Sequence, residues 1–359
     1  MRRYLKGSVR YFRKRLNVDA RRGIAFAILL LIALSFYGCN SSSTNSYKGK
    51  ILGVWPVKVY MGKDNPGLSY VLAVDPATKK VDYLYTYTVG NNLQVALSPD
   101  DQLLAMNLWD DRDTCNINVM DIKKGTVEKI SDLNGEETRM RWVDDRRIIF
   151  IFGSHEGVLG SKLLIVDKDT KEVEDLGKKL NLDADPQNDL FLAVDVDRTN
   201  KLVAFSYGKN QDFFDKKPDA LYVCNEDGSN LRRLWNSDKG SVYSIRFNED
   251  GTKIVLAARW YDESGHYKGR IVVVNIEDSS SKVIVDSSSD YYYNTSPVFL
   301  SDTEILFTSS RINAKSQSDF RMYTCNIDTG ELSSFDLLLK PEGGSEALPV
   351  NLGSMEMIY

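Results

Sequence analysis

Hydrophobic and polar residues recur in a fixed order along most of the chain. An alternating apolar segment is followed by a short polar turn and a second apolar segment, at residues 95–106, 140–150, 194–205, 245–256 and 297–307. The second segments begin at Leu103, Ile148, Leu202, Ile254 and Ile305, at intervals of 45 to 54 residues. Alternation indicates half-buried β-strands, and a long fixed period is typical of repeat proteins. The pattern predicts a series of related β-hairpins.

Each unit ends in a second hairpin, at residues 117–130, 163–176, 221–234, 271–285 and 322–335. In these segments Asp, Asn, Gly and Thr separate runs of β-branched and aromatic residues, as hairpin turns require. Each unit is therefore predicted to be a four-stranded antiparallel sheet with strands A to D. A sheet with two apolar faces is unstable alone, and radial stacking on its neighbours buries both faces. We predict an all-β fold, a β-propeller of four-stranded blades.

The two ends of the repeat region predict how the ring closes. Residues 70–87 form a C–D hairpin that lacks a preceding A–B hairpin, and residues 348–359 align without gaps on residues 296–307. The C-terminal segment is expected to supply the missing strand A, alone or with part of B, and residues 51–59 to supply or extend B. Such a composite blade removes free sheet edges. Five continuous blades and one composite blade give six, with seven as the alternative.

The N-terminal region has the pattern of an export signal or a membrane anchor. Residues 1–22 are strongly basic, and residues 23–38 contain no charged residue. As a helix the apolar segment would span about 24 Å, which is short for a bilayer core of about 30 Å. Basic residues before an apolar segment stay cytoplasmic, so the remainder is expected to be exported. We predict a signal or anchor segment at 1–39, a polar tether at 40–49 and a propeller at 50–359.

The end of the apolar segment, Gly38 followed by Cys39, resembles the cleavage site of a bacterial lipoprotein signal. That resemblance implies a signal peptide and a lipid attached to Cys39. Phe36 and Tyr37 depart from the family pattern, which has Leu and then a small residue at these positions. An uncleaved membrane anchor and ordinary signal cleavage remain as alternatives. All three predict an extracytoplasmic protein, and the first two predict attachment to the membrane.

Charge and composition exclude several classes of function. The chain has 46 Lys and Arg and 50 Asp and Glu. Nine of the basic residues and one acidic residue lie in residues 1–39, which leaves 37 basic and 49 acidic residues, a net charge of −12. Such an acidic body repels phosphate, so no nucleic acid is expected as a partner. The two histidines, His155 and His266, are too few for a three-imidazole metal site and are expected in solvated loops.

The cysteines do not indicate a metal or redox site, because none of the four has CxxC spacing. Cys224 and Cys325 occupy equivalent strand C positions in blades that are not adjacent, so we expect buried free thiols. Carboxylates in the A–B turns are expected to form the turns and not to bind calcium. No metal and no cofactor is expected.

Three turn segments resemble a known repeat. Residues 98–101 (SPDD), 248–251 (NEDG) and 225–228 (NEDG) are similar to the WD40-like repeat, also called PD40, of TolB-type propellers. The same repeat forms the propeller of prolyl-oligopeptidase and dipeptidyl-peptidase relatives. The resemblance covers about residues 50–359 and implies a six-bladed propeller. It departs from both families, because TolB has an additional N-terminal domain and the peptidases have a hydrolase domain with a GxSxG nucleophile.

Loop lengths predict which face of the propeller binds. The A–B and C–D turns are short throughout, whereas the B–C and D–A connections are long, and long loops on a rigid scaffold commonly carry function. Aromatic residues and arginine, which are enriched at binding hot spots, occur in these loops. Packing of the aromatics beneath their own loops is the alternative. The candidate partner-binding residues are Trp109, Asp111, Arg112, His155, Phe213, Phe214, Trp260, Tyr261, Tyr291, Tyr292 and Arg311.

These features predict a non-enzymatic, membrane-tethered, extracytoplasmic protein. Its expected partner is an envelope or extracellular protein, a peptide or a glycan, bound by the long B–C and D–A loops, and the chain is expected to be a monomer. The alternative is a propeller hydrolase or lyase that uses carboxylates near the central channel. No catalytic residue can be assigned from the sequence.

Overall fold

The computed structural model describes residues 46–57, 68–87, 93–110, 114–154, 160–182, 189–209, 220–238, 240–263, 265, 267–288, 293–310, 320–340, 347–350 and 352–359. The chain divides into two compact units, Met1–Ser46 and Tyr47–Tyr359. The second unit begins before the predicted propeller start at residue 50, and Tyr47 is buried in its core. The predicted signal segment and Cys39 lie outside the described residues. Within the ranges given, no helix is long and apolar enough to cross a membrane.

Strands dominate the unit Tyr47–Tyr359, and most of them form antiparallel sheets of four. One sheet joins both ends of this unit, in the order β26 (Gly353–Met357), β1 (Ile51–Val57), β2 (Leu68–Val74) and β3 (Val81–Tyr87). In three other sheets the strands follow chain order. The first consists of β12 (Asp189–Asp197), β13 (Leu202–Lys209), β14 (Ala220–Asn225) and β15 (Arg232–Asn236). The second consists of β16 (Ser241–Phe247), β17 (Lys253–Tyr261), β18 (Tyr267–Asn275) and β19 (Ser281–Val285), and the third of β20 (Tyr293–Ser301), β21 (Glu304–Ser310), β22 (Arg321–Asn326) and β23 (Leu332–Ser334).

The remaining long strands form an eight-stranded sheet that divides into two halves. Its strands are β4 (Val95–Leu97), β5 (Leu103–Trp109), β6 (Cys115–Asp121), β7 (Val127–Lys129), β8 (Gly135–Trp142), β9 (Arg147–Ser154), β10 (Ser161–Asp167) and β11 (Val173–Asp175). A single parallel bridge between Cys115 and Glu136 joins β6 to β8. The short elements are α3 (Leu176–Lys179), β24 (Leu338–Leu339) and β25 (Leu348–Pro349).

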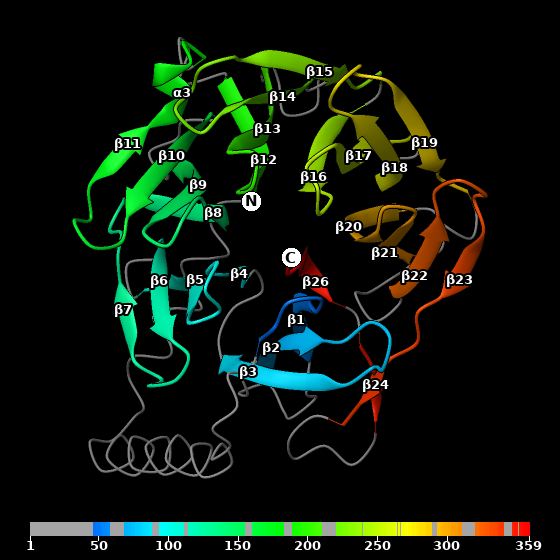
Figure 1. Cartoon of the computed structure of the whole chain (residues 1–359), viewed down its shortest axis with the longest axis horizontal. Helices are drawn as coiled ribbons and strands as arrows, with labels where there is room; N and C mark the ends of the chain where they lie inside the picture. Colours follow the sequence, from blue (N-terminus) through cyan, green and yellow to red (C-terminus); the bar gives the residue numbers. More distant parts are fainter. Residues whose placement is uncertain are drawn as a thin grey trace, which may run out of the picture. The chain divides into compact units, whose positions relative to one another are not determined.

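These sheets surround a common axis. In Figure 1 the strands β4, β8, β12, β16, β20 and β26 lie nearest the centre, and the last strand of each group lies at the rim. Successive inner strands contact one another, β26 contacts β20, and β1 contacts β4. Antiparallel sheets that pack around an axis in this way form a β-propeller, so the predicted fold class is confirmed. The number of six blades stays a prediction for the whole chain.

The first and last strands of the unit Tyr47–Tyr359 belong to one sheet, as the sequence predicts. The C-terminal strand β26 supplies the inner position and pairs with β1, where Met357 lies opposite Ile51 and Glu356 opposite Leu52. The backbone N–H of Gly49 donates to the carbonyl of Ile358 at 2.7 Å, which extends the pairing beyond the strands. Pairing of the two ends leaves no unpaired edge on the inner side of β1.

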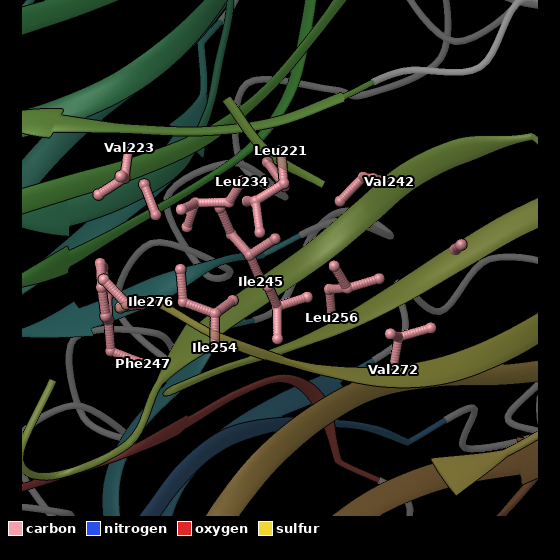
Figure 2. Packing of buried hydrophobic residues seen from close by; sticks show 14 residues of the cluster. Leu221, Val223, Leu234, Val242, Ile245, Phe247, Ile254, Leu256, Val272 and Ile276 are labelled. Carbon is pink, nitrogen blue, oxygen red and sulfur yellow. The ribbon is translucent and has the colours of Figure 1, made fainter. Parts of the chain in front are cut away.

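The core consists of apolar clusters between neighbouring sheets. Figure 2 shows one of them, in which Leu221 and Val223 of β14 and Leu234 of β15 face Ile245 of β16 and Leu256 of β17. Side chains alternate between the two faces of a strand, so each sheet contributes one face to each of two such clusters. Burial of one Leu or Ile stabilises the fold by about 1.5–3 kcal/mol, which makes stacking of the sheets the main source of stability.

Carboxylates at the A–B turns hold the turns, as expected. Oδ1 of Asp144 accepts the N–H groups of Arg146 and Arg147 at 2.8 Å each. Oδ1 of Asp197 accepts those of Thr199 and Asn200 at 3.0 and 3.2 Å. In these Asx turns an Asp carboxylate accepts the backbone N–H groups two and three residues further along the chain.

Candidate binding site

Four of the buried charged residues on the inner strands form a group that we call the axial quartet: Arg141 of β8, Asp195 of β12, Arg246 of β16 and Glu356 of β26. Nε of Arg141 lies 2.8 Å from Oδ1 of Asp195, and Nη1 of Arg141 lies 3.8 Å from Oε2 of Glu356. Oδ2 of Asp195 accepts the N–H of Phe247 at 2.8 Å. The quartet contains two positive and two negative groups, so it neutralises itself.

Arg246 connects β16 to the C-terminal strand. Its Nε and Nη2 donate to the carbonyl of Met355 at 2.9 and 2.7 Å, and its Nη1 donates to the carbonyl of Ile245 at 2.6 Å. Burial, and then the charge of Arg141, lower the pKa of the Arg246 guanidinium to about 9. Burial raises the pKa of the Glu356 carboxyl, against the charges of Arg141 and Arg246. The quartet therefore fastens β26 across the ring at a cost in desolvation.

A cavity of about 260 Å³ lies at the quartet, at the ends of the inner strands that lead into the A–B turns. We call it the turn-end cavity. Its lining includes Lys48, Arg198, Glu249 and Tyr359 in addition to three members of the quartet, Asp195, Arg246 and Glu356. Nζ of Lys48 lies 3.6 Å from Oε1 of Glu249. With Asp197, the lining has four acidic and three basic side chains.

A second cavity, of about 230 Å³, lies at the opposite ends of the inner strands, where the D–A connections enter them. We call it the loop-end cavity. Its lining residues are Gln94, Asn107, Trp109, Cys115, Glu136, Thr138, Arg139, Ile151, Phe191, Leu192 and Tyr243. This is the face on which the sequence predicts binding, and Trp109 is one of the predicted residues.

β-Bulges place three of these side chains. The pairing register shifts between Thr138 and Arg141 in β8, between Phe191 and Val194 in β12, and between Val242 and Ser244 in β16. Arg139, Leu192 and Tyr243 lie within these bulges and line the cavity. A bulge turns a residue out of the pleat, so it re-aims a side chain that would otherwise pack between sheets. Arg139 also has φ 57°, a strained backbone conformation for a residue other than glycine.

Arginine and tyrosine alternate beside the cavity. The guanidinium carbons of Arg139 and Arg259 lie 4.3 and 3.9 Å from the centre of the Tyr243 ring. Nη1 of Arg259 also donates to the hydroxyl of Tyr293 at 3.3 Å. The charge of Arg139, together with that of Arg259, lowers the pKa of the Tyr243 phenol although its burial opposes this. Two guanidinium groups thus lie against this one ring.

Polar groups fix the entry of β4 next to the cavity. The N–H of Gln94 donates to Oδ1 of Asn107 at 2.6 Å, and the N–H of Arg139 donates to Oε1 of Gln94. In the sheet that begins with β12, the hydroxyl of Ser206 has the same role, because it accepts the N–H groups of Leu192 and Ala193 at 3.3 and 3.0 Å. The Nδ2 of Asn107 is buried and has no hydrogen-bond partner within the described residues.

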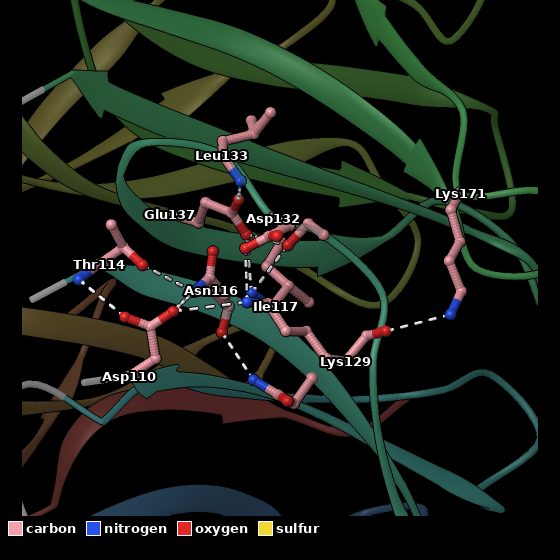
Figure 3. A network of polar contacts seen from close by, with 11 residues as sticks. Asp110, Thr114, Asn116, Ile117, Lys129, Asp132, Leu133, Glu137 and Lys171 are labelled. Carbon is pink, nitrogen blue, oxygen red and sulfur yellow. Dashed lines mark hydrogen bonds and ion pairs between the residues drawn. The ribbon is translucent and has the colours of Figure 1, made fainter. Parts of the chain in front are cut away.

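A buried carboxylate holds β6 and β8 together next to this site. Glu137 is fully buried, and its Oε2 accepts the N–H of Ile117 at 2.7 Å and the hydroxyl of Ser131. Figure 3 shows this contact within a network that also contains Asp110 and Asn116. Burial raises the pKa of the Glu137 carboxyl, although the bond from Ser131 opposes this. The network fixes the first half of β8, which carries Glu136, Thr138 and Arg139 into the cavity.

The other predicted binding residues are only partly covered. Trp260 is half-buried beneath Arg270, whose guanidinium carbon lies 4.9 Å from the ring centre, and Tyr261 is 41% exposed. Arg270 belongs to β18, the strand that pairs with β17. The role of Trp260 and Tyr261 in binding a partner stays a prediction. Eight predicted residues lie outside the described residues: Asp111, Arg112, His155, Phe213, Phe214, Tyr291, Tyr292 and Arg311.

Sequence reasoning missed Gln94, Asn107, Arg139, Tyr243 and Arg259. All of them lie within strands or directly before one, whereas the predicted binding residues were assigned to loops. One signal was present: Tyr293 belongs to the triple tyrosine at 291–293, of which it is the member that the structure describes. A bulge leaves no residue pattern of its own, so the inward direction of Arg139 could not be read from the chain.

The described cysteines behave as predicted. Cys115, Cys224 and Cys325 are free and buried. Cys224 and Cys325 occupy equivalent strands and pair opposite Val203 and Ile305. Burial raises the pKa of the thiols of Cys115 and Cys224 to about 12, so neither is a reactive thiolate at neutral pH. Within the described ranges, no cluster of three or more His, Cys, Asp or Glu side chains could hold a metal ion.

Comparisons with known proteins support the fold. No known protein family and no curated protein matches this chain. The structure is similar to that of TolB from Acinetobacter baumannii, with a TM-score of 0.58 and 14% identity, covering 91% of this chain and 69% of that one. A putative TolB from Agrobacterium tumefaciens gives 0.52 and 14%, with coverages of 84% and 97%. A chain of a nidogen/laminin complex gives 0.53 and 12%, with coverages of 83% and 96%. These likenesses show a TolB-like β-propeller fold.

Proposed function

We propose that this chain is a non-enzymatic propeller that binds a partner polypeptide on the face of its long B–C and D–A loops. The observation that carries the proposal is the loop-end cavity, whose lining combines Arg139, Tyr243 and Trp109. Arginine and large aromatic residues contribute most to binding energy at protein interfaces. At the turn end, by contrast, the buried arginines lie beside the buried carboxylates of Asp195 and Glu356.

The comparisons favour a protein partner among the predicted classes. One similar solved structure is that of a protein–protein complex, between nidogen and laminin. We further propose that the protein acts outside the cytoplasm and is held at the membrane by its N-terminal region, through a lipid on Cys39 or an uncleaved anchor. The basic residues 1–22 followed by the apolar residues 23–38 support this location.

Site-specific photo-crosslinking tests the proposed face. A photoreactive amino acid replaces the exposed Tyr261 at the loop end in one variant, and Asp169 in the β10–β11 turn in the control. Expressed in the native envelope, the Tyr261 variant is expected to form a discrete adduct with one protein, and the Asp169 variant none. Equal adducts at both positions, or adducts at Asp169 alone, would contradict the proposed face.

An enzymatic role is the alternative, and it would depend on the channel carboxylates Asp195 and Glu356. The raised pKa of Glu356 is the observation in its favour, because a general acid needs such a shift. However, Asp195 already accepts the backbone N–H of Phe247 and pairs with Arg141. Turnover of glycosides, lactones or peptides that Glu356→Gln abolishes would favour the enzyme.

A further inference from the structure

The loop-end cavity contains a hydrogen-bond donor that the fold does not use. Asn107 is 1% exposed, and its Oδ1 accepts the N–H of Gln94. Ser206 performs this backbone role in another sheet with a hydroxyl group alone. Among the described residues, no acceptor lies within hydrogen-bonding distance and angle of the additional Nδ2 of Asn107. Only the thiol of Cys115, which is a weak acceptor, interacts with this amide. A buried donor without a good acceptor is costly, so a ligand that accepts from it gains affinity.

The same cavity contains a guanidinium without a carboxylate partner in the described part of the chain. The Arg139 guanidinium stacks on Tyr243, and its backbone N–H donates to Gln94. Arg141, two residues along β8, pairs with Asp195. The bulge and the positive φ of Arg139 thus hold a half-buried positive charge at the cavity, away from the ion pairs of the quartet.

We propose that the loop-end cavity binds a carboxylate that a partner polypeptide presents, with Arg139 and Asn107 as the donors and Trp109 as the apolar wall. The inference rests on the proposed function, because it concerns the same face. A carboxylate has two acceptor oxygens, which suit one guanidinium fork and one amide N–H. A cavity of about 230 Å³ accommodates one or two residues of a peptide and not a folded surface. The carboxylate is either a C-terminus or an Asp or Glu side chain.

The charges around the cavity are consistent with an anionic ligand. Glu136 is the single carboxylate in the described lining, and Arg139 is the single guanidinium. Arg259 adds a second positive charge on the Tyr243 ring. The charge of Arg139, and with it that of Arg259, lowers the pKa of the Tyr243 phenol against the effect of its burial. Glu136 is therefore expected to weaken carboxylate binding, and its removal to strengthen it.

Calorimetric titration of the full chain in detergent micelles tests the proposal with three short peptides. The first, acetyl-Gly-Phe, has a free C-terminal carboxylate; the second is its C-terminal amide; the third, acetyl-Gly-Glu-Gly-amide, has only a side-chain carboxylate. At least one carboxylate peptide is expected to bind about tenfold more tightly than the amide, because charge-assisted hydrogen bonds are lost in the amide. The peptide that binds identifies the source of the carboxylate. Equal affinity of all three, or absence of binding, would overturn the proposal.

Four variants assign the contacts. Arg139→Gln removes the charge, and Asn107→Ser keeps an acceptor oxygen while it removes Nδ2; each is expected to weaken carboxylate binding about tenfold or more and to leave the amide unaffected. Glu136→Gln is expected to strengthen carboxylate binding about threefold. Arg147→Gln, an arginine that pairs with Asp144 near the turn end, is the matched control and is expected to change nothing. Thermal unfolding of each variant confirms that it is folded.

The outcomes separate this inference from the proposed function. If the Tyr261 crosslink to a partner forms but carboxylate peptides bind no better than the amide, the loop face binds a partner and the carboxylate inference is wrong. If carboxylate peptides bind through Arg139 and Asn107 but no protein crosslinks at Tyr261, the cavity binds carboxylates and the partner proposal is wrong. Carboxylate affinity that Arg139→Gln leaves unchanged would also overturn the inference.

Discussion

The two ends of the inner strands use arginine in opposite ways. At the turn end, Arg141 and Arg246 are buried with Asp195 and Glu356, and Arg246 holds the main chain of β26. At the loop end, Arg139 stacks on Tyr243 in a bulge, and no carboxylate of the described residues pairs with it. A single residue, Met140, separates Arg139 from Arg141. One strand can therefore hold one arginine in the buried ion pairs of the ring and another at the loop-end cavity, because a bulge separates the two side chains.

The largest expected effect comes from removal of the C-terminal strand. Deletion of residues 341–359 removes β26 and the buried side chains of Leu352, Met355 and Ile358, and it exposes the edge of β1. Each such side chain stabilises a fold by about 1.5–3 kcal/mol, and domains of this kind are stable by only about 5–15 kcal/mol. We expect the cooperative thermal transition, followed by circular dichroism, to be lost.

Substitution of Leu338, which is 63% exposed and lies before the deleted segment, provides the control. Leu338→Gln is expected to leave the transition within a few degrees of the parent chain. If the deletion behaves like Leu338→Gln, the turn end does not close the ring, and the contrast between the two ends is wrong.

Disruption of the axial quartet is the next largest effect. Arg141→Leu leaves Asp195 buried without its guanidinium partner, which typically costs about 3–5 kcal/mol. Arg147→Leu breaks the ion pair between Arg147 and Asp144, in which the two side chains are 34% and 42% exposed. This substitution is expected to cost at most about 1 kcal/mol, because exposed ion pairs contribute little. Urea denaturation at pH 7 measures both free energies of unfolding. Equal values would mean that burial of the quartet adds nothing.

The pH dependence of stability gives a smaller, signed test of the turn end. Burial raises the pKa of Glu356 in the folded state above its unfolded value, so the folded state binds this proton more tightly. The corresponding stability is present below the unfolded pKa of about 4.3 and is lost as pH rises through the folded pKa. Glu356→Gln does not titrate, so its stability relative to the parent chain is expected to increase with pH across this window.

Denaturation curves at several pH values between 4 and 8 measure this difference in the free energy of unfolding. The control is Glu249→Gln, because Glu249 lines the same cavity but its side chain is 64% exposed. A difference between Glu356→Gln and the parent that falls as pH rises would contradict the assignment of a buried, destabilised carboxylate to the turn end.

The sequence predicted the fold well, because the hydrophobic pattern repeats in every sheet and carries the information on both strands and turns. It predicted that residues 51–59 and the C-terminus share one sheet, since an incomplete repeat at each end requires a partner, and the structure has residues 51–57 in that sheet. The site was predicted only as a face. Trp109 lines the cavity and was also among the predicted residues, because it lies at the end of β5 next to a loop. Arg139 and Tyr243 depend on bulges, and Asn107 on an unused amide group, and these are three-dimensional properties.

The smallest expected effect completes the comparison at the loop end. Arg139→Leu removes a half-buried guanidinium that stacks on an aromatic ring, and such a contact contributes about 0.5–2 kcal/mol. No buried carboxylate of the described residues loses its counter-charge, and Leu relieves none of the strain at φ 57°. Urea denaturation is therefore expected to show a loss of about 1 kcal/mol, well below that for Arg141→Leu two residues away. If the two substitutions cost the same, Arg139 is part of the structural framework, and the proposed division between a closing end and a binding end of the inner strands is wrong.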